Sequence, residues 1–394
     1  MGNKPSVNQE LNTEKTTIFQ SQEGVVYRIP ALFYHAEEKV FLAFAEKRRA
    51  KDDHTSEALA MKTGTVNNDQ TTNELIVTWS DLKLVKEAHL EGHRPMNPCP
   101  VYDKTNKKLF LFFVCVKGIV SECWQRFWGC NNTRLCYITS TDAGKTWSQV
   151  TDLTDALAEV KQWATFAVGP GHGIQGQSDR LIVPVYGYVS CSNSFCCIMC
   201  YCAVSRALCL YSDDKGVTWQ FGNLLEKESG ECEMAEICDD KGNRSIYCNA
   251  RSSEGHRVEA VSADNGEDFG ILPNGTLVET GSGCQGSVVS FPIQNEGIKR
   301  KAEQSQDPRW LLFSHPNDKG ERKDLGVYLN KSPHEPKNWS SPWIINKGPS
   351  GYSDLVYIGD GMFACLMERG DNSEIEQIAF SIFSYNEVKK GTEE

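Results

Sequence analysis

Residues 140–147 read STDAGKTW, and the same pattern returns twice further along the chain. Residues 212–219 read SDDKGVTW and residues 262–269 read SADNGEDF, so all three stretches fit S-x-D-x-G-x-[TD]-[WF]. The glycine suits a left-handed turn, and the aspartate can accept hydrogen bonds from its own backbone. Each copy therefore predicts a tight hairpin whose terminal aromatic side chain packs back between neighbouring strands. Three copies in one chain indicate a repeated structural unit.

The aromatic ends of these hairpins set the length of the repeat. Trp147, Trp219 and Phe269 close the three copies, and Trp79 and Trp339 occupy degenerate versions of the same position. A unit of about 65 residues, which is long enough for a four-stranded sheet with its loops, fits these spacings and divides the chain six times. Radial repetition of such sheets predicts a six-bladed β-propeller.

Between the hairpins, short runs of β-branched and aromatic residues predict strands. Helical periodicity is scarce, and residues 154–164 (TDALAEVKQWA) form the best local candidate for a helix. The fold class is therefore all-β. We expect one domain over residues 21–388, with a polar N-terminal tail at 1–20 and a short tail at 389–394. The strand-like runs are KVFLAFAE, KLFLFFVCV, RLIVPVYGY, RVEAVSAD, WLLFSH and GVYLN.

Composition and charge restrict the class of partner. The content of 40% hydrophobic and 24% charged residues is ordinary for a globular protein, and the formal net charge of -11 argues against nucleic acid. A local cluster of arginines could still bind an anionic ligand. The 16 cysteines follow a polar N-terminus without an apolar leader, which favours reduced thiols in the cytosol over a disulfide framework. No stretch approaches the ~20 apolar residues that span a bilayer.

Two segments bear on membrane contact and metal binding. Residues 1–6 (MGNKPS) fit the pattern for N-myristoylation at Gly2, which would give reversible membrane contact; the alternative is a disordered polar tail. Residues 191–202 (CSNSFCCIMCYC) contain a CxxC pair at Cys197 and Cys200, but no second pair follows at the spacing of a zinc site. We expect a thiol-rich strand or an acylated loop there, and no metal.

One arginine stands inside an apolar strand. Residues 25–34 read VVYRIPALFY, and a guanidinium at Arg28 is costly to bury unless it is paired. Arg251 in NARSS and Arg322 in GERKDLGVYL also stand beside apolar strand residues. Guanidinium binds carboxylate through paired, charge-assisted hydrogen bonds, so three such residues could hold an anionic ligand. The alternative is a private structural ion pair for each arginine.

The YRIP motif at residues 27–30, together with the three hairpins, resembles the sialidase (exo-α-neuraminidase) family over essentially the whole chain. In that family the hairpins are Asp-boxes and the propeller is the catalytic domain. ECEMAE at 231–236 and KGPSGYSDL at 347–355 resemble the membrane-associated, ganglioside-preferring branch. Further motifs similar to the vertebrate cytosolic and plasma-membrane sialidases are MNPCP at 96–100, TFAVGPGHG at 165–173, GCQGSV at 283–288 and GYSDL at 351–355.

This resemblance implies an exo-α-sialidase that hydrolyses terminal sialic acid from gangliosides, glycoproteins and oligosaccharides with retention, without metal or cofactor. Arg28, Arg251 and Arg322 would hold the substrate carboxylate. Tyr352 would be the nucleophile, and Glu231 the base that takes its proton. A neutral phenol avoids the repulsion that an aspartate would meet from the substrate carboxylate, but its pKa near 10 means that it needs a base.

The resemblance also implies an acid/base in residues 45–59 (AEKRRAKDDHTSEAL). Counting from Glu46 without a gap places it at Asp53, whereas a gap of one residue would place it at Asp52; the loop could also be a merely solvated, charged one. Further implied contacts with the sugar are Arg48 near the carboxylate and O4, Met96 and Asn97 at the N-acetyl group, Tyr186 and Tyr188 at the glycerol tail, Gln285 on the floor, and Glu122 in a mobile rim loop.

The aromatic residues of that rim loop, residues 120–130 (VSECWQRFWGC), have two interpretations. Trp124, Phe127 and Trp128 could touch lipid or glycan, or could pack on each other. The implied partners are sialylated glycolipids and glycoproteins, with peripheral membrane contact and no nucleic acid. The implied location is the cytosol or the cytoplasmic side of a membrane. Two other functions fit the same motifs: a sialic-acid-binding propeller without catalysis, and a transferase that passes the sialyl group to another sugar.

Overall fold

The computed structural model describes residues 14–68, 75–190, 203–239, 241–273, 275–294 and 308–393. The proposed acylation at Gly2 and the cysteine run at 191–202 lie outside these ranges. Within them the chain is mostly β-strand, as predicted, and the α-helices are α1 (Glu122–Trp128) and α2 (Tyr385–Glu393). Neither of these helices is long and apolar enough to cross a membrane.

The strands of the described residues pair into five sheets in which chain order and spatial order largely agree. The first contains β2 (Val26–His35), β3 (Val40–Arg48), β4 (Ser56–Asn68) and β5 (Leu75–Trp79), with β6 (Lys83–Leu84) paired to β4. The second contains β7 (His93–Asp103), β8 (Lys108–Lys117), β9 (Thr133–Ser140) and β10 (Thr151–Asp152). The third contains β11 (Trp163–Val168), β13 (Leu181–Ser190), β14 (Ala203–Ser212) and β15 (Gln220–Phe221), with β12 (Ile174–Gln175) paired to β13.

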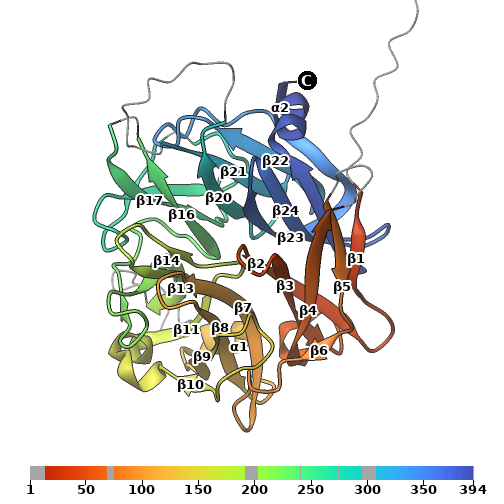
Figure 1. The fold of residues 1–394 in the computed structure, drawn as a ribbon. Helices are drawn as coiled ribbons and strands as arrows, with labels where there is room; N and C mark the ends of the chain where they lie inside the picture. The colour runs from red at the N-terminus through yellow and green to blue at the C-terminus, as the bar shows by residue number, and fades with distance from the viewer. Residues whose placement is uncertain are drawn as a thin grey trace, which may run out of the picture.

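The fourth sheet contains β16 (Cys232–Cys238), β17 (Arg244–Ala250), β18 (Val258–Ser262) and β19 (Gly270–Ile271). The fifth contains β20 (Ser287–Pro292), β21 (Arg309–Pro316), β22 (Lys323–Asn330), β23 (Trp343–Gly359), β24 (Met362–Arg369), β25 (Gln377–Ser384) and β1 (Thr16–Gln20). Figure 1 shows the sheets following one another around a ring. Because β1 pairs antiparallel with β25, the first and last strands of the chain lie in one sheet and close the ring.

Three expectations about local structure were wrong. Residues 16–20, expected in the N-terminal tail, form β1, because Ile18 and Phe19 are buried against the last sheet. Residues 389–393, expected as a tail, continue α2, which is anchored by the buried Val388. Residues 154–164 form two 3₁₀ turns, η2 (Thr154–Ala156) and η3 (Ala158–Gln162), and then enter β11, because strand pairing with β13 outweighs the helical pattern.

The three repeated hairpins share one hydrogen-bond pattern. In the first, Ser140 Oγ donates to Asp142 Oδ1 (2.8 Å), and the backbone amides of Gly144 and Thr146 donate to Ser140 Oγ (2.9 Å) and Asp142 Oδ1 (2.9 Å). The corresponding bonds recur in the hairpins at 212–219 and 262–269. In each copy the glycine and the residue before it have positive φ. Each aspartate thus accepts hydrogen bonds from the backbone of its own hairpin turn.

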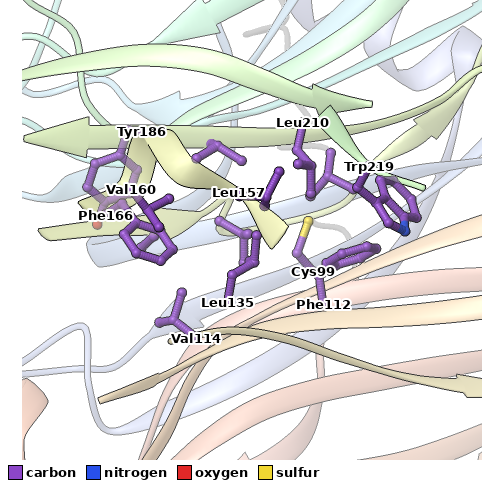
Figure 2. Packing of buried hydrophobic residues seen from close by; sticks show 14 of the residues in the cluster. Cys99, Phe112, Val114, Leu135, Leu157, Val160, Phe166, Tyr186, Leu210 and Trp219 are labelled. Atoms are coloured by element: carbon purple, nitrogen blue, oxygen red, sulfur yellow. The ribbon is translucent and has the colours of Figure 1, made fainter. Parts of the chain in front are cut away.

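The aromatic residues at the repeat positions tie neighbouring sheets together. Trp219 packs on Phe112 of β8 with ring centroids 4.8 Å apart, inside a cluster that also contains Tyr186 (Figure 2). Each of the other three tryptophans likewise packs on an aromatic residue of the preceding sheet in the ring. Neighbouring sheets are therefore joined by the same type of aromatic contact. The pairs are Trp79 with Phe380 (5.0 Å), Trp147 with Phe44 (6.2 Å) and Trp339 with Tyr247 (6.3 Å).

Candidate functional site

A bulge in β2 explains how Arg28 is accommodated. The register with β3 shifts between Arg28 and Ala31, and Ile29 adopts φ 59°, which is rare for a β-branched residue. The Ile29 amide donates to Glu368 Oε1 (2.9 Å), and Arg28 donates to the same carboxylate through Nε (2.8 Å) and Nη2 (3.1 Å). Burial disfavours the charge of Arg28, but this carboxylate outweighs it and raises the pKa of the guanidinium.

Tyr352 of β23 lies where the predicted groups meet. Its hydroxyl donates to Glu231 Oε1 (2.6 Å) and accepts from Arg251 Nη1 (3.2 Å). The guanidinium carbons of Arg28 and Arg322 lie 5.3 Å and 5.2 Å from its ring centroid. Burial and the Glu231 charge raise the pKa of the Tyr352 phenol above its ordinary value, although Arg251 and Arg322 oppose this. The phenol is therefore neutral at rest, with a carboxylate in place to accept its proton.

The three arginines differ in their other partners. Arg28 forms an ion pair with Glu368, and Arg251 forms one with Glu231 at 2.8 Å. Both arginines therefore have the structural ion pair that was the alternative to ligand binding. Arg322 donates to the Gly283 carbonyl (2.9 Å) and forms no ion pair with a carboxylate of the described residues. All three nevertheless line one cavity with Tyr352. An ion pair that orients a guanidinium toward a cavity does not prevent it from binding a further anion.

The cavity has a volume of about 590 Å³ and collects most of the predicted residues. Gln285 is the exception to the predicted lining. It is 1% exposed, and its amide donates to Glu233 Oε1 (3.1 Å) and the Ser353 carbonyl (2.9 Å), which places it behind the wall. Besides the arginines and Tyr352, the predicted residues that line the cavity are Arg48, Asp52, Asp53, Met96, Asn97, Glu122, Tyr186, Tyr188 and Glu231.

The two candidate acids in the loop after β3 have different surroundings. Asp53 begins a 3₁₀ turn, η1 (Asp53–Thr55), and its Oδ2 accepts from the Glu122 amide (3.2 Å) and lies 3.8 Å from Arg94 Nη2. Asp52 is exposed, and its side chain makes no hydrogen bond within the described part of the chain. The structure therefore holds Asp53, but not Asp52, in one orientation at the cavity.

Two carboxylates, the buried Glu46 and the partly exposed Glu122, bind residues of the remaining walls. Glu46 accepts from Arg48 Nε (2.7 Å) and from the amide of Asn97 (2.7 Å), which has φ 56°. Glu122 accepts from the Tyr186 hydroxyl at 3.4 Å. Its side chain is 39% exposed, and partial desolvation raises its pKa although the Tyr188 hydroxyl opposes this.

A second polar layer, formed by His172, Glu233 and Asp354, is joined to Gln285 through the hydrogen bond to Glu233. His172 Nδ1 contacts Asp354 Oδ1 (2.7 Å) and lies 3.6 Å from Glu233 Oε2, which also accepts from Ser287 Oγ (2.8 Å). Among the described residues, His172, Glu233 and Asp354 are the group whose spacing could hold a metal ion. His172 and Asp354 are hydrogen-bonded to each other, and Glu233 accepts from Gln285, Ser287 Oγ and the Val288 amide, so each carboxylate has protein donors without an ion.

The His172 layer predicts a loss of stability in alkali. Burial disfavours the charged ring, but Asp354 and Glu233 outweigh it and raise the pKa of His172 from 6.5 to about 9. A raised pKa stabilises the fold fully below pH 6.5, and this contribution is lost as the pH rises through 9. We expect the free energy of unfolding to fall by about 3 kcal/mol over that range. Denaturant titrations at several pH values measure this, and His172→Gln should flatten the slope; an unchanged slope in the variant would exclude His172 as its source.

Two supporting residues were not predicted from the sequence. Glu368 accepts from Arg28, Ile29 and the Tyr352 amide (3.0 Å), and a side chain at Gly351 would collide with it. Glu46 positions Arg48 and Asn97. Both glutamates stand at the end of an apolar strand, in FLAFAE and in FACLME, and both are fully buried. A charged residue in an apolar strand was the feature by which Arg28 was selected. The same criterion applied to acidic residues would have selected Glu46 and Glu368.

The geometry defines a class of enzyme. Guanidinium groups around a cavity fit a sugar that carries a carboxylate. A phenol hydrogen-bonded to a glutamate, with a tethered aspartate on the same cavity, fits the class of glycoside hydrolases in which a tyrosine replaces the usual second carboxylate.

Comparisons with known proteins identify the family. The model of the BNR repeat-like domain matches residues 22–365. Sialidase-3 of Mus musculus is 43% identical over 95% of each chain, and Sialidase-2 of Cricetulus griseus is 42% identical over 94% of this chain and 95% of the relative. The fold resembles the Trypanosoma rangeli sialidase solved as a covalent intermediate with 2,3-difluorosialic acid, with a TM-score of 0.67, 18% identity and coverage of 97% of this chain and 60% of the other. The chain belongs to the sialidase family and is a β-propeller glycoside hydrolase of the branch that contains Sialidase-2 and Sialidase-3.

Proposed function

We propose that this sialidase releases terminal sialic acid from glycolipids, glycoproteins and oligosaccharides with retention, through a covalent intermediate on Tyr352. The observation that carries the proposal is the contact of the Tyr352 hydroxyl with Glu231 (2.6 Å) inside a ring of three arginines. The arginines bind the substrate carboxylate and so place the anomeric carbon next to the phenol. Arg322, which pairs with no carboxylate of the described residues, has the most capacity for this contact.

In the first half-reaction, Tyr352 attacks the anomeric carbon while Glu231 takes the phenolic proton. Asp53 in its acid form protonates the glycosidic oxygen, and the bond to the aglycone breaks. The transition state resembles an oxocarbenium ion, and the nearby negative charge of the substrate carboxylate stays bound to guanidinium. In the second half-reaction, Asp53 takes a proton from water, the water displaces Tyr352 from the anomeric carbon, and Glu231 returns the proton to the phenolate.

Asp53 and Asp52 should differ sharply when replaced. We expect Asp53→Asn to lower kcat/KM about a hundredfold or more for sialyllactose, whose leaving group needs protonation, and much less for an aryl sialoside. Asp52→Asn should stay within about twofold of wild type on both substrates, because its side chain is exposed and untethered. Steady-state kinetics on the two substrates measure both variants. If Asp52→Asn showed the substrate-dependent loss and Asp53→Asn did not, the assignment would be reversed.

The stereochemical outcome tests the proposed function itself. Proton NMR of the reaction mixture during the first minutes should show the α-anomer of sialic acid, which then mutarotates to the β-anomer. Direct release of the β-anomer would mean inversion and would exclude a tyrosyl intermediate. Transfer of the sialyl group to added lactose, in place of release to water, would instead favour a transferase.

We also infer that the ring consists of six four-stranded blades with Asp-box hairpins, forming one catalytic domain that includes residues 21–388. The three hairpins each join the third strand of a sheet to the fourth, and Trp339 stands at the same place between β22 and β23. The first part of β23 pairs with β22 and the part from Ser350 pairs with β24, which supports a division of the seven-stranded sheet into two blades. A single cooperative transition in calorimetry is expected.

We propose peripheral membrane contact on the cytoplasmic side as well, with Gly2 acylated. The support is the N-terminal sequence pattern. The intact mass of the N-terminal peptide isolated from eukaryotic cells tests it, and an unmodified peptide would exclude the acyl chain.

A further inference from the structure

Helix α1 turns its apolar residues to solvent and its polar residue inward. Trp124, Phe127 and Trp128 are 44%, 53% and 58% exposed, whereas Gln125 is 1% exposed. Gln125 Oε1 accepts from the Asn132 amide and from the Thr133 hydroxyl (3.1 Å), so the orientation of the helix is fixed from inside. A surface helix of a globular protein normally buries its apolar face. Packing among the described residues therefore does not account for the three aromatic residues.

We call Ile119, Trp124, Phe127 and Trp128 the aromatic surface. These four are half of the eight large hydrophobic residues that are exposed in the described part of the chain, and Ile119 is 76% exposed. The ring of Trp128 contacts those of Phe127 (5.0 Å) and Trp124 (6.4 Å). The rings thus do pack on each other, but this leaves about half of each exposed, which is unusual for a surface without a partner.

A basic groove of about 450 Å³ adjoins the helix. Thr133, whose hydroxyl holds Gln125, lines both this groove and the substrate cavity. Lys117 and Lys161 line the groove, are exposed, and form no ion pair within the described residues. Arg134, also in the groove, is neutralised by Asp152 (2.6 Å) and Asp155 (2.9 Å). The charge of Lys161 also acts on Asp155, but the three cations Lys117, Arg134 and Lys161 outnumber the two carboxylates Asp152 and Asp155 by one. In a chain of net charge -11, this groove is a local positive site.

We propose that the aromatic surface and the basic groove together dock this protein on a phospholipid bilayer. Tryptophan rings favour the headgroup level of a bilayer, and lysines near the surface attract lipid phosphate. Neither element needs an acyl chain. The charge of the groove complements the phosphates, and the exposed aromatics supply the apolar contact.

The position of α1 gives this docking a consequence for catalysis. Glu122, Cys123 and Arg126 line the substrate cavity, while the aromatic residues of the same helix do not. A bilayer lying against the aromatic surface therefore meets the protein at the rim of the cavity, where the sugar of a sialylated lipid would stand. This last step rests on the proposed function; the docking itself does not.

Vesicle binding tests the proposal with the full chain expressed in bacteria, which do not add myristate. Vesicles of phosphatidylcholine with about one-fifth phosphatidylserine should sediment the wild type. Combined Trp124→Ala, Phe127→Ala and Trp128→Ala should lower the partition coefficient about tenfold or more. Combined Lys117→Glu and Lys161→Glu should abolish the preference for phosphatidylserine over pure phosphatidylcholine. Val217→Ala, which removes a 78%-exposed apolar residue from the hairpin at 212–219, is the matched control and should bind like wild type.

Activity on soluble sialyllactose separates the two proposals. The wild type, the aromatic triple variant, the lysine double variant and Val217→Ala should all retain this activity, since none of the replaced residues lines the cavity. Failure of the wild type to bind vesicles, or equal binding by the aromatic triple variant, would overturn the docking proposal and leave the aromatic surface to a protein partner. Absence of sialidase activity with intact vesicle binding would instead refute the proposed reaction alone.

Discussion

Replacing Tyr352 by Phe is expected to lower the kcat of sialoside hydrolysis by about a thousandfold or more, because the variant lacks the oxygen that forms the covalent intermediate. The loss should appear with aryl sialosides as well as with sialyllactose, since a good leaving group does not replace a nucleophile. KM should change much less, because the guanidinium groups of Arg28, Arg251 and Arg322 remain. Steady-state kinetics with a fluorogenic sialoside measure the effect.

The fold should survive this change. In the variant, Glu231 keeps its ion pair with Arg251 at 2.8 Å, and the two hydrogen bonds of the hydroxyl, to Glu231 and from Arg251, are lost at a cost of about 1 kcal/mol each. Tyr357→Phe is the matched control, because it removes a hydroxyl from the same strand outside the cavity, where that hydroxyl accepts from the Gly361 amide (3.3 Å). Full activity of Tyr352→Phe, or equal losses in both variants, would rule out the assignment.

Replacing Arg28 by Ala should produce the largest loss of stability. Glu368 is fully buried, and Arg28 is its ion-pair partner. Removing one partner of a buried ion pair costs about 3–5 kcal/mol, because the other charge stays in the interior without compensation. Chemical denaturation measures the change in the free energy of unfolding. Activity should fall as well, since the guanidinium lines the cavity.

A double variant separates these two effects. In Arg28→Ala combined with Glu368→Gln, neither charge of this pair remains. The Ile29 and Tyr352 amides bind different oxygens of Glu368, so the single glutamine oxygen can accept from only one of them. We expect part of the stability to return, because the uncompensated charge is gone although one amide loses its acceptor, while the activity stays low. Recovery of activity together with stability would show that Arg28 only neutralises Glu368 and does not bind substrate.

The repeats in the sequence predicted the β-propeller fold, because each hairpin is formed by residues that are close together in the sequence. The Asp142 carboxylate and the positive φ of Gly144 are encoded within a few residues, and the pattern repeats visibly. The closing strand β1 could not be predicted in this way. Its pairing with β25 joins residues at opposite ends of the chain, and five residues without a turn motif give no local sign of it.

The site residues could be predicted from the sequence where the expected reaction requires one particular residue type, such as a tyrosine nucleophile or an arginine that binds a carboxylate. Tyr352 and Glu231 meet as expected, and three arginines surround them. Gln285 was expected on the floor of the cavity, but it lies behind the wall, because its amide is used by Glu233 and Ser353. Which polar residue faces a cavity and which supports it depends on the exact strand register, and motif spacing does not carry that information.

The most direct test of this account is to identify the residue that becomes covalently bound to the sugar. Incubation with 2,3-difluorosialic acid followed by rapid acid quench, proteolysis and mass spectrometry maps the adduct. The account predicts the mass of one fluorosialyl group on the peptide that contains Tyr352, and its absence in Tyr352→Phe. An adduct on Glu231 or Asp53, or complete inactivation without any adduct, would contradict it.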